Sequence, residues 1–141
     1  MRYNFFLFKK LSIVGVLLLG LGACSVISEH NRTPEQAVKE RAAERWQALI
    51  EDKLETAYTY LTPEYRKLYS YQQYKKSIHS GFWTKAEVKD VACTENCVVS
   101  MQIYVTIRPP RWGQAINSSS LLKEHWTRDK DSGEWFYLSS E

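Results

Sequence analysis

The residues of this chain best suited to chemistry are its three cysteines, Cys24, Cys93 and Cys97. Cys93 and Cys97 are separated by three residues and lie between two strand-like segments. A loop this short places both cysteines at the feet of a hairpin, where their side chains approach closely enough to bridge. The C-x-x-x-C spacing is not that of a redox dithiol, and no nearby histidine completes a zinc set. In an oxidising compartment we therefore expect a structural disulfide that stabilises modestly, because the loop is short.

Histidine and carboxylate side chains form the second group with chemical potential. The candidate acids or bases are His125, which is next to Trp126, and Asp90, which lies on the first expected strand. His125 shares a strand face with Lys123 and Thr127, so we expect it to face solvent. No ligand cluster predicts a metal site, and no glycine-rich loop predicts a nucleotide site. The sequence therefore favours a protein without a catalytic centre, metal or other cofactor.

The first 23 residues have the layout of an export signal. Arg2, Lys9 and Lys10 form a basic start, and the run from Leu11 to Leu21 contains only apolar and small residues. This run is shorter than the roughly 18 to 20 apolar residues that cross a bilayer. A permanent transmembrane helix is therefore the weaker interpretation.

The segment Leu21-Gly22-Ala23-Cys24 ends this leader. It resembles the lipobox of bacterial lipoproteins, in which the cysteine receives a diacylglycerol and becomes the first residue after cleavage. The resemblance implies a signal peptide over 1–23, a lipidated Cys24 with a tether over 24–32, and membrane anchoring at the bacterial cell envelope. Ser25 stands where an aspartate would favour the inner membrane, which favours the outer membrane and a domain facing the periplasm. An ordinary signal peptide with an unmodified Cys24 is the alternative.

Size and charge constrain what remains after the leader. Removal of 23 of the 141 residues leaves 118, which is enough for one domain with a modest core. Three of the 19 Lys and Arg residues and none of the 16 Asp and Glu residues lie in the leader, so the remainder carries 16 of each. A balanced charge without basic runs argues against nucleic acid as a partner. We expect a single domain over 33–141.

The first half of this domain is predicted to be helical in several pieces. Thr33-Pro34 with Gln36 is a strong helix start, and Thr62-Pro63 and Ser70 with Gln73 repeat the signal. The expected segments begin at residues 34, 54, 63 and 71. Apolar residues of the first helix, to about Ile50, recur at three- and four-residue spacing, and its charged residues, including Arg45, are expected on the other face.

The second half is predicted to be sheet. Alternation begins at Thr84 and changes face at Val91, and Cys97 to Ile107 carries the cleanest period-two pattern in the chain. A longer loop is expected from Arg108 to about Ser119 because Pro109 and Pro110 lack the ladder donor. Two further strands, over 122–128 and 134–138, form a terminal hairpin.

This element order and the landmarks Glu124, Trp126, Gly133 and Trp135 resemble the nuclear-transport-factor-2-like superfamily, which includes ketosteroid isomerase. The resemblance implies an α+β fold with N-terminal helices packed on a curved four-stranded antiparallel sheet, shaped as a cone. In that fold the cone holds a small ligand, an active site or nothing, so the resemblance does not deliver a function.

Aromatic residues supply the remaining candidate surface. Trp46, Trp126 and Phe136 fit core positions. For a second set the hydrophobic pattern does not decide between packing in the core, lining the mouth of a pocket and forming a partner surface. This set comprises Tyr58, Tyr65, Tyr69, Trp83 and Trp112, together with Arg66 and Arg111. We therefore expect a non-catalytic envelope lipoprotein that binds an envelope protein or a small apolar ligand. The alternatives are an isomerase- or hydratase-like enzyme with an acid or histidine in the cone, and an accessory subunit of an envelope assembly or secretion complex.

Overall fold

The computed structural model describes residues 32–111 and 113–139, where four helices precede four strands. The expected signal peptide, Cys24, most of the tether and Trp112 lie outside the described residues. The elements are α1 (Pro34–Ile50), α2 (Leu54–Thr59), α3 (Pro63–Leu68), α4 (Tyr71–Ser77), β1 (Trp83–Cys93), β2 (Cys97–Ile107), β3 (Ile116–Arg128) and β4 (Trp135–Leu138). The predicted α+β class with a four-stranded antiparallel sheet is confirmed.

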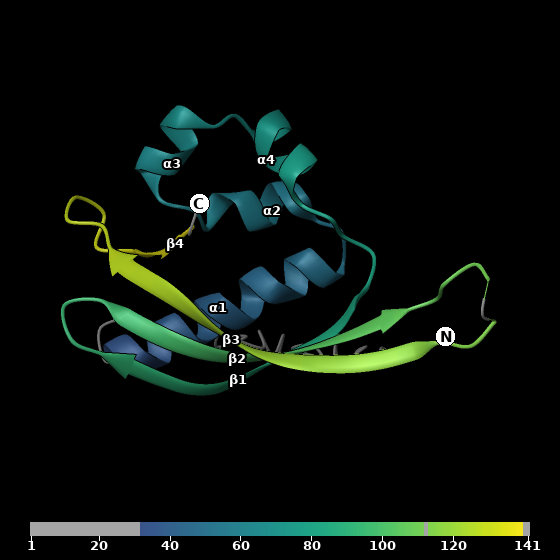
Figure 1. The fold of residues 1–141 in the computed structure, drawn as a ribbon. Helices are drawn as coiled ribbons and strands as arrows, with labels where there is room; N and C mark the ends of the chain where they lie inside the picture. The colour runs from purple at the N-terminus through teal and green to yellow at the C-terminus, as the bar shows by residue number, and fades with distance from the viewer. Residues whose placement is uncertain (1–31, 112, 140–141) are drawn as a thin grey trace, which may run out of the picture.

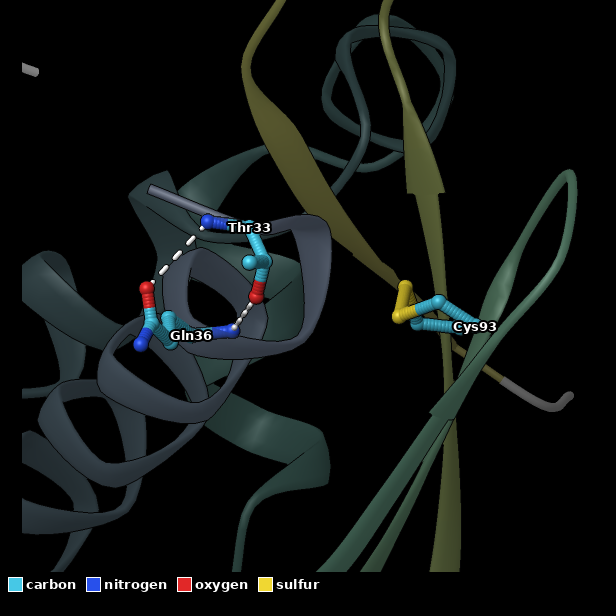
Figure 2. Close-up of a disulfide and its surroundings, with 4 residues drawn as sticks. Thr33, Gln36 and Cys93 are labelled. Carbon is cyan, nitrogen blue, oxygen red and sulfur yellow. Dashed lines mark hydrogen bonds between the residues drawn. A yellow bond between two sulfur atoms is a disulfide. The ribbon is translucent and has the colours of Figure 1, made fainter. Parts of the chain in front are cut away.

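The helix starts follow the capping signals of the sequence. At α1 the Thr33 hydroxyl accepts a hydrogen bond from the Gln36 amide, and the Gln36 side chain accepts one from the Thr33 amide (Figure 2). Ser70 and Gln73 repeat this capping box at α4, and Thr62 caps α3. These bonds satisfy amides that have no partner within the helix. Among the described residues, no helix combines the length and apolar character needed to cross a membrane.

The sheet is a simple meander in the order β1-β2-β3-β4 (Figure 1). Cys93 and Cys97 face each other at the β1–β2 turn and form the expected disulfide (Figure 2). The predicted change of face near Val91 coincides with a register shift between Val88 and Asp90. At the same end of the sheet as the disulfide, Gly133 adopts a positive φ of 74° in the β3–β4 turn, which explains a glycine at that position.

One predicted boundary is wrong. The sequence favours a loop to about Ser119, but β3 begins at Ile116 and pairs with β2 through all three serines. Serine has a low intrinsic preference for strands. The long β2 strand offers a row of backbone hydrogen-bond partners, and this pairing outweighs the low preference of the serines. The β2–β3 hairpin therefore extends beyond the helices as a two-stranded projection (Figure 1).

The core lies between α1 and the inner face of the sheet. From β2 it takes Val99, Met101 and Ile103, which alternate with residues that are partly exposed. Trp46 from α1 and Trp126 from β3 are both buried, as their positions in the sequence predict. The apolar face of α1 thus explains the placement of this helix against the sheet.

Candidate functional site

A carboxylate lies at the centre of this core. Glu124 of β3 is 2% exposed, and its inward position follows from the same alternation that turns Leu122 and Trp126 toward the helices. Its Oε1 accepts hydrogen bonds from Nη1 of Arg45 and from the indole nitrogen of Trp46, each at 2.7 Å. Its Oε2 accepts a third bond, from the indole nitrogen of Trp126 at 3.2 Å. The pair Arg45–Glu124 is therefore a buried salt bridge enclosed by two tryptophans.

The position of Arg45 corrects the prediction that it lies on the polar face of α1. Arg45 is only 5% exposed, and its guanidinium carbon lies 3.9 Å from the ring centre of Tyr137, which favours a cation–π interaction. Helical spacing alone assigns an arginine to the solvent side because burial of a lone charge is costly. The missed signal was Glu124, a carboxylate in phase with the buried residues of its strand.

Tyr74 of α4 borders this cluster. Its hydroxyl is buried with no hydrogen-bond partner among the described residues. Burial raises the pKa of Tyr74 above its usual value of 10.0, and the charge of Arg45 offsets part of that rise. An unsatisfied buried hydroxyl costs stability, whereas a phenyl ring of the same shape does not carry this cost.

We therefore expect Tyr74→Phe to raise the free energy of unfolding by about 1 kcal/mol at pH 7. The folded state raises the pKa of Tyr74, so it disfavours the ionised side chain. The free energy of unfolding of the parent is therefore unaffected by this ionisation below pH 10 and falls as pH rises from 10 through the folded-state pKa. The phenylalanine variant has no such ionisation. The difference between variant and parent is expected to widen above pH 10. Urea denaturation at pH 7 and pH 10.5 measures both effects, and a variant less stable than the parent at pH 7 would show that the hydroxyl has a partner.

The cluster is enclosed and its carboxylate is paired. The two oxygens of Glu124 accept hydrogen bonds from three protein donors, and the carboxylate is 2% exposed. The two acid or base candidates from the sequence, Asp90 and His125, are both exposed. Within residues 32–111 and 113–139 no group of three or more metal-binding side chains comes together.

The predicted aromatic candidates lie in packing contacts. Tyr58 donates a hydrogen bond to the carbonyl oxygen of Tyr69 at 2.7 Å, and its ring lies 5.4 Å from that of Tyr74. Tyr65 stacks on Tyr69 with ring centres 4.8 Å apart. Trp83 meets Trp46 edge-on at 5.5 Å. Tyr58 thus ties α2 to α4 and to the end of α3, and Trp83 ties β1 to α1. Tyr65 and Tyr69, in contrast, pack on each other at α3.

Surface hollows are found along α1. One of about 560 Å³ lies between α1 and the β3–β4 hairpin, where Arg41 and Trp135 are among the lining residues. A smaller one of about 250 Å³ lies between the start of α1 and β1 and includes Asp90. Neither hollow is lined by Tyr58, Tyr65, Tyr69 or Trp83.

An exposed apolar surface lies on the projecting hairpin, which we call the arm (residues 106–117), beyond the last pair of β1 with β2 at Val105. Ile107 and Ile116 are 50% and 43% exposed, and Leu121, which is 61% exposed, lies farther along β3 on its opposite face. Ile107 and Ile116 are paired across the two strands, so their side chains lie on the same face. The predicted site residue Arg111 is exposed at the arm's tip. The sequence named Arg111 and Trp112 of the arm as candidates, but it did not single out Ile107 and Ile116, because it assigned part of the arm to a loop.

Comparison with known proteins gives a fold and no function. No family model matches the chain, and no curated protein sequence matches it. Among solved structures the chain is similar to a SEC-C motif-containing protein from Psychrobacter arcticus, with a TM-score of 0.52 and 16% sequence identity. The alignment covers 92% of this chain and 75% of that one. At this identity the likeness shows a related fold alone.

Proposed function

We propose that this protein is a non-catalytic binding module of the bacterial envelope, anchored by a lipid on Cys24, whose arm binds a partner protein. The observation that carries the proposal is the exposure of Ile107 and Ile116, which are paired on one face of a hairpin that extends past the helices. These apolar side chains add little to the core of the domain, and covering them with a partner would be favourable. The leader and its lipobox support the location at the membrane.

The domain is, by this proposal, a cone-shaped member of the nuclear-transport-factor-2-like superfamily. The order of helices before a four-stranded meander supports it, as does the packing of α1 across the sheet. The interior position that would hold a ligand or a catalytic acid is occupied by the Arg45–Glu124 pair and its tryptophans. This occupancy favours a binding surface outside the cone over an isomerase- or hydratase-like site within it.

Photo-crosslinking in the native envelope tests the proposal. With p-benzoylphenylalanine in place of Ile107, we expect a discrete crosslinked product in the membrane fraction of irradiated cells. Leu68 on α3 is the matched control, because it is apolar and 74% exposed but lies away from the arm. The Cys24→Ala chain is expected to leave the membrane fraction. Equal products from both positions, or none from Ile107, would contradict the proposed role of the arm.

A further inference from the structure

Among residues 32–111 and 113–139, nothing pairs with the long edge of β3 along most of its length. β4 pairs only with His125 to Arg128, so Ile116 to Glu124 have a strand partner on the β2 side alone. No backbone hydrogen bond to a loop or turn involves these nine residues in the described structure. Unpaired amides and carbonyls along an edge are a template for another strand.

The other edges of the sheet are protected. β1 is interrupted by register shifts at two places and carries Lys85 and Lys89, which form ion pairs with Glu87. The short β4 strand is covered by the chain before α3, since the amide of Tyr137 donates to the carbonyl oxygen of Tyr60 at 2.8 Å. Bulges, lysines and covering segments are the usual means by which proteins prevent edge pairing. The β3 edge has no charged side chain from Ile116 to Leu122.

We infer that the occupant of this edge is a second copy of the same chain, joined antiparallel about a twofold axis at Ser119. This inference rests on the proposed function, because it names the partner that the arm binds. Antiparallel self-pairing of one edge gives a closed twofold dimer. It would extend the sheet from four to eight strands across the two copies.

The side chains along the uncharged segment suit this register. Its centre is Ser119, so that Ser119 faces Ser119 of the second copy, Ser118 faces Ser120, and Ile116 faces Leu122. Ile116 and Leu122 lie on the same face of β3, because they are an even number of residues apart on the strand. The pairing therefore covers an exposed isoleucine with a leucine and places small hydroxyl side chains opposite one another, both of which stabilise antiparallel pairs.

Charge also favours the antiparallel arrangement. The arm tip carries Arg108 and Arg111 and no acidic residue. In this register each tip points toward the β3–β4 turn of the second copy, where residues 129–134 include three carboxylates and one lysine. A parallel arrangement would instead place the two basic tips side by side. Attraction between the tip and the turn orients the two copies.

Single cysteine substitutions at three positions of β3, made in the full-length protein in its native membrane, test the inference. Ser119→Cys is expected to give a disulfide-linked dimer on a non-reducing gel, because the two Cα atoms in the paired strands would be about 5 Å apart. Ser118→Cys and Ser120→Cys are matched controls, equally exposed but displaced from their own counterparts by two residues. Each alone is expected to remain monomeric, and co-expression of the two is expected to give a mixed dimer.

A second variant tests the same edge without a cysteine. Ser119→Lys places two ammonium groups opposite each other at the axis, and we expect it to raise the dimer dissociation constant by roughly fivefold or more. Thr84→Lys, an exposed position on β1, is the control and is expected to leave the constant unchanged. Equal crosslinking at positions 118, 119 and 120, or none at 119, overturns the inference. Where position 119 gives no dimer but the Ile107 crosslinker captures a protein of different mass, the inference fails and the proposed function stands; where both give nothing, both fail.

Discussion

Replacing Glu124 with glutamine is expected to lower the free energy of unfolding by roughly 3 to 5 kcal/mol. The substitution keeps the size of the side chain but removes the charge that balances Arg45, whose side chain is 6% exposed. Arg45 would then be a buried cation with no carboxylate partner, and the indole groups of Trp46 and Trp126 would compete for a single amide oxygen. Denaturant unfolding followed by tryptophan fluorescence measures the loss.

Substitution of Arg45, the other member of the ion pair, separates the contribution of the pair from that of either residue alone. Arg45→Met alone leaves Glu124 buried without its cation and is expected to cost a similar amount. The double variant Arg45→Met with Glu124→Leu replaces two charges by apolar side chains and is expected to recover part of the stability. The remainder is not recovered because the indole N–H groups of Trp46 and Trp126 lose their acceptor. Glu87→Gln is the control, because this carboxylate forms its ion pairs at the surface and its loss is expected to have little effect. A small effect of Glu124→Gln would show that the pair is not the structural centre described above.

The second large effect is expected from Trp126→Ala. Trp126 is fully buried, and its ring packs 6.0 Å from that of Tyr137 while its indole nitrogen donates to Glu124. Removing the ring leaves a cavity and deprives the carboxylate of a donor, so we expect a loss of about 3 to 5 kcal/mol in the free energy of unfolding.

Two variants separate the contributions at this position. Trp126→Phe retains much of the apolar volume but lacks the N–H group, and is expected to lose clearly less than the alanine variant. Trp83→Ala removes a tryptophan that is only partly buried and is expected to cost less than Trp126→Ala. Thermal unfolding of the three variants gives the ranking, and an equal loss from Trp83→Ala would contradict the assignment of Trp126 to the centre of the core.

The buried pair and the open edge belong to one arrangement. Arg45 and Trp46 hold α1 on β3 through Glu124, near the end of β3 that pairs with β4. The core is therefore concentrated at that end of the strand, while the segment from Ile116 to Leu121 is exposed. Substitutions on the arm are expected to change association without changing the stability of the domain.

Local signals in the sequence determined most of the elements. Capping residues such as Thr33 and Ser70 act on amides within their own turn, so the helix starts at α1 and α4 were predictable without knowledge of the rest of the chain. The strict alternation along β2 and the short loop between Cys93 and Cys97 determined a hairpin in the same way. The lipobox ending at Cys24 is read from the sequence alone and stays a prediction.

Tertiary structure decided the features on which the proposals depend. Whether Arg45 is buried depends on a carboxylate 79 positions away, and no local pattern on α1 contains that information. The start of β3 at Ile116 depends on β2, which supplies the hydrogen bonds that three serines do not favour by themselves. The open edge is decided by the length of β4, because the four residues of β4 pair with only four of the thirteen residues of β3. Sequence by itself determines what each segment prefers, whereas pairing between distant segments determines which charges are buried and which edges remain available.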